Sequence, residues 1–122
     1  MASEITITCS MAFAKGNVAS ISRASTGLAR DVTGSAYHAN VQSVGTSEEA
    51  ILLGDAGVGG YFWGKNLDST NFIKIRAATG IADLVRLKAG DVCLFRIDSG
   101  ATAPYAIADT ATCLLEYLLI AA

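Results

Sequence analysis

The sequence has little of the material from which catalytic and metal sites are built. Its 122 residues include one histidine, His38, and three cysteines, Cys9, Cys93 and Cys113. One histidine with scattered cysteines gives no zinc-ligand spacing, and no segment resembles the nucleophile elbow of a serine hydrolase. We therefore expect no catalytic residue, no metal and no other cofactor. The cysteines are expected to be reduced thiols that act as small apolar residues in strands.

Charge and long apolar runs are also scarce. Charged residues make up 16% of the chain and the net charge is −2, too close to neutral to indicate a nucleic-acid or anionic-membrane partner. No basic segment precedes the first apolar residues, and the apolar run at 113–122 is interrupted by Glu116 and too short to cross a bilayer. We expect neither an ordinary export signal nor a membrane-spanning segment.

Apolar residues, in contrast, are abundant for a chain of this length. They make up 52% of the sequence, although a chain of this size must also keep a water-facing surface. The length predicts a single domain over residues 1–122 with one core. The surplus of apolar residues predicts that part of the surface meets other subunits.

Alternation of apolar and polar residues predicts strands along most of the chain. The stretch 61–97 organises the prediction, because turn signals at 66–71 and 88–91 separate apolar runs of strand length and indicate consecutive antiparallel hairpins. Residues 25–35 read as a connection with at most one short strand. The remaining predicted strands cover residues 4–13, 18–24, 37–44, 49–53, 105–108 and 113–120.

Two of these strands are apolar on both sides, namely residues 92–97 and 113–120. That pattern is typical of strands covered on both faces. In all, about nine to eleven short strands are expected and no segment has a sustained helical period. The predicted fold is all-β: an antiparallel β-sandwich, jelly-roll-like, with a closed barrel as the alternative.

Basic residues are concentrated in the central stretch. Six of the nine lie there, and alternation places several of them on one face of a sheet, a pattern that we interpret as a solvated or inter-subunit face. Four aspartates are expected to compensate this charge. The basic residues are Lys65, Lys74, Arg76, Arg86, Lys88 and Arg96, and the aspartates are Asp68, Asp83, Asp91 and Asp98.

Three consecutive aromatic residues offer a different interpretation. Tyr61 and Trp63 share one strand face and Phe62 takes the other. Tyr61 and Trp63 could stack on a sugar, with Asp68 and Asn71 as hydrogen-bonding partners. The competing interpretation is packing in the core or in a subunit interface, where aromatic residues supply large buried areas. The turn aspartates could also bind calcium, although such residues usually hold backbone amides.

Several segments together resemble a family of small structural proteins of tailed-bacteriophage virions. The most specific is the turn Asn66-Leu67-Asp68-Ser69-Thr70-Asn71 followed by Phe72. The other segments that carry the resemblance are residues 15–17, 37–53, 60–61, 87–91, 94–96, 106–109 and 115–117. They cover much of the chain in one consistent order.

The resemblance implies a non-enzymatic accessory component of the virus particle, made in the host bacterial cytoplasm. We expect a capsid decoration (cement) protein that works as a homo-oligomer, such as a trimer, and contacts the major capsid protein or another virion protein. Its outward-facing apolar residues are predicted to form the interface. Those residues are Ile5, Phe62, Phe72 and Leu118.

Two rival functions belong to other classes. A carbohydrate- or receptor-binding module of a phage tail or fibre would use Tyr61, Trp63, Asp68 and Asn71. An enzyme would need a Ser-His-Asp arrangement built from His38 and one of the many serines.

Overall fold

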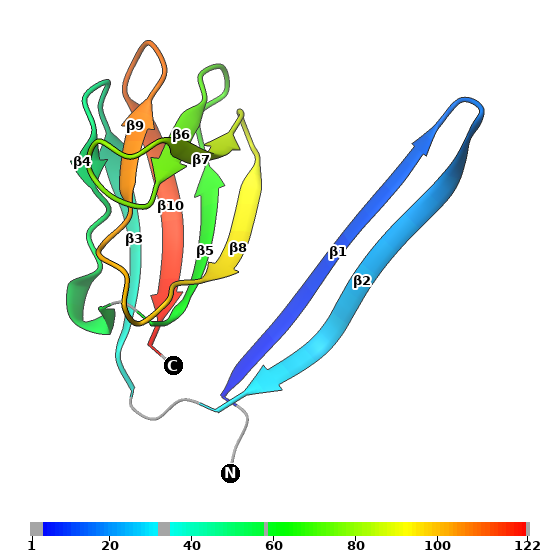
Figure 1. Ribbon diagram of the computed structural model, residues 1–122, viewed down its shortest axis with the longest axis horizontal. Helices are drawn as coiled ribbons and strands as arrows, with labels where there is room; N and C mark the ends of the chain where they lie inside the picture. Colours follow the sequence, from blue (N-terminus) through cyan, green and yellow to red (C-terminus); the bar gives the residue numbers. More distant parts are fainter. Residues whose placement is uncertain (1–3, 32–34, 58, 122) are drawn as a thin grey trace. The chain divides into compact units, whose positions relative to one another are not determined.

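The computed structural model describes residues 4–31, 35–57 and 59–121, with Val18 described in its backbone alone. Contacts divide the chain into two units, residues 1–33 and 34–121. Figure 1 shows the first unit as one long hairpin and the second as a sandwich of two sheets. The expectation of a single sandwich over residues 1–122 is therefore corrected: the N-terminal strands pair with each other and belong to neither sheet of the sandwich.

The hairpin consists of β1 (Ile5–Lys15) and β2 (Val18–Arg30), paired antiparallel. Gly16 takes a φ of 48° at the turn between them, a left-handed conformation that costs glycine little. The predicted connection at 25–35 is wrong over its first half, because β2 continues to Arg30. A register shift between Ile7 and Cys9 absorbs the extra residues of β2, and Gly27 there has a φ of 67°.

The second unit contains eight strands in two four-stranded sheets. The first sheet has the order β3-β10-β5-β8 and the second β4-β9-β6-β7, and every pairing in both is antiparallel. The first sheet contains β3 (Tyr37–Val44), β10 (Cys113–Ile120), β5 (Tyr61–Asn66) and β8 (Val92–Arg96). The second contains β4 (Glu49–Ala50), β9 (Tyr105–Ala108), β6 (Ile73–Arg76) and β7 (Asp83–Leu87), and a short 3-10 turn, η1 (Gly54–Ala56), precedes β5.

The strand pairs are nested: β3 pairs with β10, β4 with β9, β5 with β8 and β6 with β7. This nesting over two sheets is the topology of a jelly roll, so the predicted antiparallel sandwich is confirmed. The expectation of consecutive hairpins in 61–97 is wrong in part. Within residues 61–97, β6 and β7 are the only consecutive strands that pair with each other, because the turns at 66–71 and 88–91 carry the chain from one sheet to the other.

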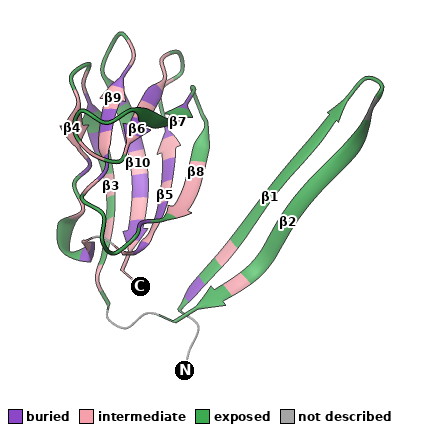
Figure 2. Cartoon of the chain, viewed as in Figure 1, coloured by how far each residue is buried: buried purple, intermediate pink, exposed green. Residues whose placement is uncertain are grey.

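The core lies between the two sheets, where each strand directs alternate side chains inward (Figure 2). Phe62, Leu115 and Leu119 are fully buried, and the Phe62 ring stacks on Phe95 and Tyr117 with centroids 5.1 and 5.6 Å apart. Two polar residues, Gln42 and Asn66, are buried with them. Among the described residues, no helix has the length and apolar composition needed to span a membrane.

The side chains of Gln42 and Asn66 are satisfied by hydrogen bonds, as burial requires. Asn66 donates to the carbonyl oxygens of Leu87 and Asn71, each at 2.9 Å, and accepts from the amide of Asp68 at 2.9 Å. Gln42 likewise accepts from the Leu52 amide at 3.0 Å. These bonds fix the loops that join the two sheets.

Candidate interaction surfaces

The outer face of the sheet β3-β10-β5-β8 is the most apolar surface of the sandwich. Alternation directs one set of side chains from each strand into the core, and the other set points outward. We call this outward surface the sheet face. Its apolar residues are Tyr37, Ala39, Val41, Tyr61, Trp63, Val92, Leu94, Leu114, Leu118 and Ile120.

The register places an apolar row across the middle of the sheet face. Leu118 lies opposite Ala39 on one side and Trp63 on the other, and Trp63 lies opposite Leu94. A shallow hollow of about 570 Å³ opens beside this row and is lined by side chains that include Val41 and Trp63. Cross-strand apolar pairs of this kind stabilise a sheet. No other described residue of the sheet covers the outer surface of this row.

Few charges interrupt the sheet face. Glu116 and Lys65 lie directly opposite each other in neighbouring strands. At the end of β8, the guanidinium of Arg96 lies 5.2 Å from the ring centre of Tyr61, within the range of a cation–π contact. The charges therefore sit at positions where they have an opposite charge or an aromatic ring beside them.

The outer face of the other sheet has the opposite character. Asp83 accepts from Arg76 at 2.7 Å and lies 3.2 Å from the Lys74 ammonium, and Arg76 also lies 3.5 Å from Glu48. Desolvation, the largest single influence, raises the pKa of Asp83, but the bonds from Lys74 and Arg76 outweigh it and hold the pKa below its ordinary value. The predicted charged sheet face is thus found here, whereas Lys65 and Arg96 belong to the apolar sheet face.

The hairpin carries a second apolar surface. The register of β1 and β2 places seven apolar side chains on one side of the ribbon, and threonine, serine and alanine on the other. We call the apolar side the hairpin face: Ile5, Ile7, Cys9, Met11, Phe13, Ile21 and Leu28. Met11 is 79% exposed, and Figure 2 shows almost the whole hairpin as exposed.

Two of the predicted interface residues do not face outward. Phe62 is completely buried, because its strand turns it toward Phe95 and Tyr117 in the core. Ile5 is also buried, at 5% exposure. Both assignments are corrected: alternation separates the two sides of a strand but does not say which side is covered, and Ile5 lies in the hairpin on the same side as Ile7.

The other two predicted interface residues lie at the surface. Leu118 is half-buried in the middle of the sheet face. Phe72 is half-buried before β6, and the guanidinium of Arg86 lies 4.2 Å from its ring centre. Leu118 therefore belongs to the apolar surface, whereas Phe72 is partly covered by a cation of its own sheet.

The predicted sugar-binding residues have different surroundings. Tyr61 and Trp63 do share the sheet face, as alternation predicts. Asp68, five residues beyond Trp63 and on the order of 15 Å further along the chain, accepts from the amides of Thr70 and Asn71 at 2.9 and 2.6 Å. The side chain of Asn71 accepts from the Thr110 hydroxyl at 3.1 Å. Asp68 and Asn71 thus stabilise a turn.

The environments of His38 and Cys93 also indicate structural roles. His38 points inward, 5.8 Å from the Tyr117 ring, and its Nε2 atom is buried without a hydrogen-bond partner among the described residues. Burial raises the pKa of the Cys93 thiol to about 11, which leaves it protonated at neutral pH. Within residues 4–31, 35–57 and 59–121, no group of three or more potential ligands is placed to hold a metal ion.

Sequence reasoning missed most of the sheet face, including Tyr37, Val92 and Leu94. A signal for it was present. The strands β8 and β10 were predicted to be covered on both faces, but the sandwich covers only the inner face of each: Val92 is 57% exposed and Leu114 is 48% exposed. The outer apolar residues of these strands are therefore exposed on the sheet face.

The molecule thus defines a class: a jelly-roll sandwich with one apolar and one charged outer face, preceded by an amphipathic hairpin. No family model, no curated protein and no solved structure matches this chain.

Proposed function

We propose that this chain is a non-enzymatic structural protein of a tailed-bacteriophage virion, a decoration protein that stabilises the shell through adhesive contacts. The observation that carries the proposal is the apolar sheet face, in which Leu118 and Trp63 stand at the centre of an unpartnered apolar row. The largest exposed apolar patch of a soluble protein, typically about 300–600 Å², is often functional.

The size of the sheet face is sufficient for such a role. Four strands spaced by about 4.8 Å and about six residues long cover roughly 400 Å². At about 25 cal/mol per Å² the gross gain from covering it is on the order of 10 kcal/mol. Association and ordering costs remove much of that gain, so a single contact is weak and many copies on one shell hold by avidity.

Two further observations support an adhesive function. The other outer face carries Lys74, Arg76 and Asp83 in ion pairs, which suits a side that stays in water. Jelly-roll sandwiches occur in viral capsid proteins as well as in lectins and cupins, so the fold agrees with the resemblance to virion proteins, although a fold alone never decides a function.

The test uses particles of the phage that encodes the chain. We expect mass spectrometry of purified particles to detect the protein in many copies, and electron cryomicroscopy to place the sheet face against the shell. Added protein with Leu118→Ser and Trp63→Ser should bind protein-depleted particles at least tenfold more weakly. The matched control, Ile107→Ser on the charged outer face, should bind normally. Absence of the chain from the particles would contradict the proposal.

A glycan-binding function is the second candidate, because Trp63 lines the hollow on the sheet face. It is the weaker one: Arg96 lies over the Tyr61 ring, and Asp68 and Asn71 are engaged in their turn. A glycan array separates the two. Specific binding that Trp63→Ala removes without unfolding the protein would favour the glycan-binding module, whereas the decoration protein should give no signal.

A further inference from the structure

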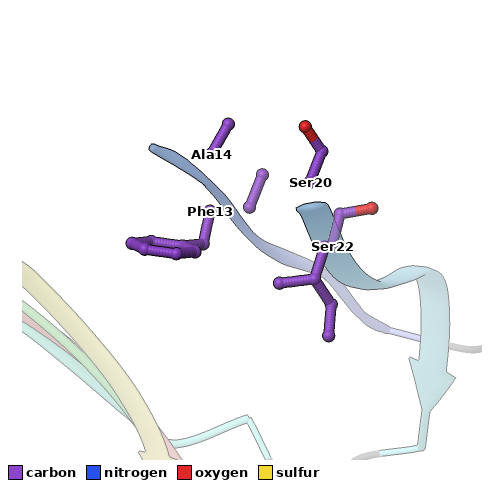
Figure 3. A pocket seen from close by; sticks show the side chains of 6 residues that line it. Phe13, Ala14, Ser20 and Ser22 are labelled. Carbon is purple, nitrogen blue, oxygen red and sulfur yellow. The ribbon is translucent and has the colours of Figure 1, made fainter. Parts of the chain in front are cut away.

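Most of the hairpin face, beyond Ile5, has no cover among the described residues of its own unit. A two-stranded sheet by itself is marginal in water, because it buries too little apolar surface. Phe13 and Ile21 lie opposite each other and are 48% and 51% exposed. Figure 3 shows Phe13 on one side of the ribbon and Ala14 and Ser20 on the other, beside an open hollow of about 410 Å³. A partner is therefore needed on the Phe13 side.

The charge of the hairpin restricts what that partner can be. Lys15, Arg23 and Arg30 all occupy register positions on the hairpin face. With Glu4 and Asp31 they give residues 1–33 a formal charge of +1, and the remaining residues, six basic and nine acidic, carry −3. A second hairpin would oppose like charges, whereas the sandwich of another copy has the complementary sign.

The sandwich has an opening of suitable character between its edge strands β7 and β8. A hollow of about 510 Å³ there is lined mainly by apolar side chains, and we call it the seam: Leu84, Val85, Phe95, Ile97, Ala101 and Pro104. Arg76, Arg96 and Asp98 line it too; Asp83 and Glu48 neutralise Arg76, and the guanidinium of Arg96 lies over the Tyr61 ring. The seam is therefore an apolar slot with charges of both signs at its margin.

The edge strands beside the seam are poorly protected. Leu84, at a register irregularity of β7, is 85% exposed. β8 has the composition of a strand covered on both faces, yet it ends its sheet and pairs only with β5. Exposed apolar edge strands favour pairing with another chain unless something covers them.

From these observations we propose that the hairpin face of one copy covers the β7–β8 seam of a second copy, and that the exchange is reciprocal. This inference rests on the self-association assumed in the proposed function and names the segments that carry it. Phe13 and Ile21 would pack against Leu84 and Phe95, and the basic side chains of the hairpin would reach Asp98 at the margin.

The area argues for a closed exchange. β7 and β8 have five residues each, about 17 Å of strand, so about that length of the two-stranded ribbon can lie on one seam and cover roughly 160 Å² on each partner. One such contact is well below the area of a stable interface, and reciprocal exchange doubles the total to roughly 650 Å², the range of weak contacts. A symmetric dimer or a small ring satisfies both surfaces in every copy.

The first experiment measures self-association of the full chain by light scattering and sedimentation. We expect wild type to form oligomers whose dissociation constant rises at least tenfold with Phe13→Ser and Ile21→Ser, and also with Leu84→Ser. The matched control, Ala12→Ser and Ala24→Ser, changes the opposite side of the same ribbon and should leave association unchanged. Circular dichroism checks that each variant keeps its β-structure.

The second experiment uses the native thiol of Cys9, which is exposed on the hairpin face. In Ala101→Cys, mild oxidation should produce covalent dimers joined through Cys9 and position 101, and adding Cys9→Ser should abolish them. Ile107→Cys, on the outer face away from the seam, is the control and should give none. Peptide mapping of mixed isotope-labelled chains identifies whether the bond joins two copies.

Three results would overturn the inference: a wild-type monomer at all concentrations, a Cys9 bond formed within one chain, or dimers joined through Cys9 of both copies. Other outcomes distinguish a failure of the exchange from a failure of the proposed function. Association that depends on Leu118 but not on Phe13, or monomers that still bind particles, would reject the exchange and leave the decoration function standing. If the copies exchange their hairpins but the chain is absent from particles, the exchange stands and the decoration function is rejected.

Discussion

At the scale of single residues, the buried polar side chains decide how the two sheets are joined. Asn66 ends β5 and makes three hydrogen bonds to backbone groups of other loops and strands while completely buried. Its sequence context predicted a turn residue. The structure shows in addition that the Asn66 side chain bonds backbone groups that would otherwise lack a partner where the chain crosses between the sheets.

Asn66→Ala should therefore be strongly destabilising. The substitution leaves the Leu87 and Asn71 carbonyl groups without this donor in a buried site, at a cost of about 2–4 kcal/mol in the free energy of unfolding. The matched control Asn71→Ala removes one exposed hydrogen bond to Thr110 and should cost less than about 1 kcal/mol. Urea denaturation measures both. If the two variants lost the same free energy of unfolding, the buried Asn66 hydrogen bonds would contribute no more to stability than the exposed Asn71 bond.

Two aspartates should make the fold sensitive to acid. Hydrogen bonds from the amides of Asn71 and Thr70 lower the pKa of Asp68 from its ordinary value of 3.8, and the pKa of Asp83 is also lowered. Because the folded pKa lies below the unfolded one, the unfolded chain takes up protons first. The stability that these carboxylates contribute is present above about pH 4 and is lost as the pH falls through the folded pKa.

Denaturation midpoints measured between pH 7 and pH 2.5 test this. We expect the wild-type midpoint to fall in the acid range, and the double variant Asp68→Asn, Asp83→Asn to be less stable near neutrality but flatter in acid. If the midpoint of the double variant fell in acid by as much as that of wild type, other groups would be responsible for the acid sensitivity.

At the scale of elements, alternation and turn residues predicted most strands, because a strand is a local pattern with a period of two residues. The predicted bounds of residues 37–44, 105–108 and 113–120 coincide with β3, β9 and β10. β2 was predicted too short, since its continuation depends on pairing with β1 and on a bulge. Pairing partners and the exchange of sheets at 66–71 involve distant residues, so local pattern could not supply them.

A close approach of backbones gives a prediction at this scale. At Gly60, just before β5, a Cβ atom would overlap the carbonyl group of Ile120 at the end of β10. Gly60→Ala must displace two adjoining central strands and should lower the free energy of unfolding by about 1–3 kcal/mol or more. Gly45→Ala is the control, because its nearest neighbour would be a Glu49 carboxylate oxygen at 3.6 Å. Thermal unfolding should rank Gly60→Ala well below Gly45→Ala and wild type.

At the scale of the whole molecule, the chain consists of two units with different means of support. The sandwich has a core of buried residues from both sheets, whereas the hairpin has one pairing of strands and an apolar face. Local opening free energies follow such differences in burial. The hairpin should therefore depend on association, and the sandwich should not.

Amide hydrogen exchange tests this division. In dilute solution, where chains are separate, the hairpin amides should exchange at least tenfold faster than those of β5 and β10 in the centre of their sheet. Raising the protein concentration should slow exchange in the hairpin and at β7 and β8, and leave β10 unchanged. Hairpin protection that is high and independent of concentration would show that the ribbon needs no second copy.

The sequence by itself determined the strand periods, the turns, the all-β class and the excess of apolar residues, since each is a local or compositional property. Only the tertiary structure decided which sheet each strand joins, that Phe62 points inward while Leu118 points outward, and that β1 and β2 pair with each other and join neither sheet of the sandwich. The physical reason is that a strand pattern distinguishes two sides without saying which side meets the core. That choice is made by contacts between strands far apart in the chain.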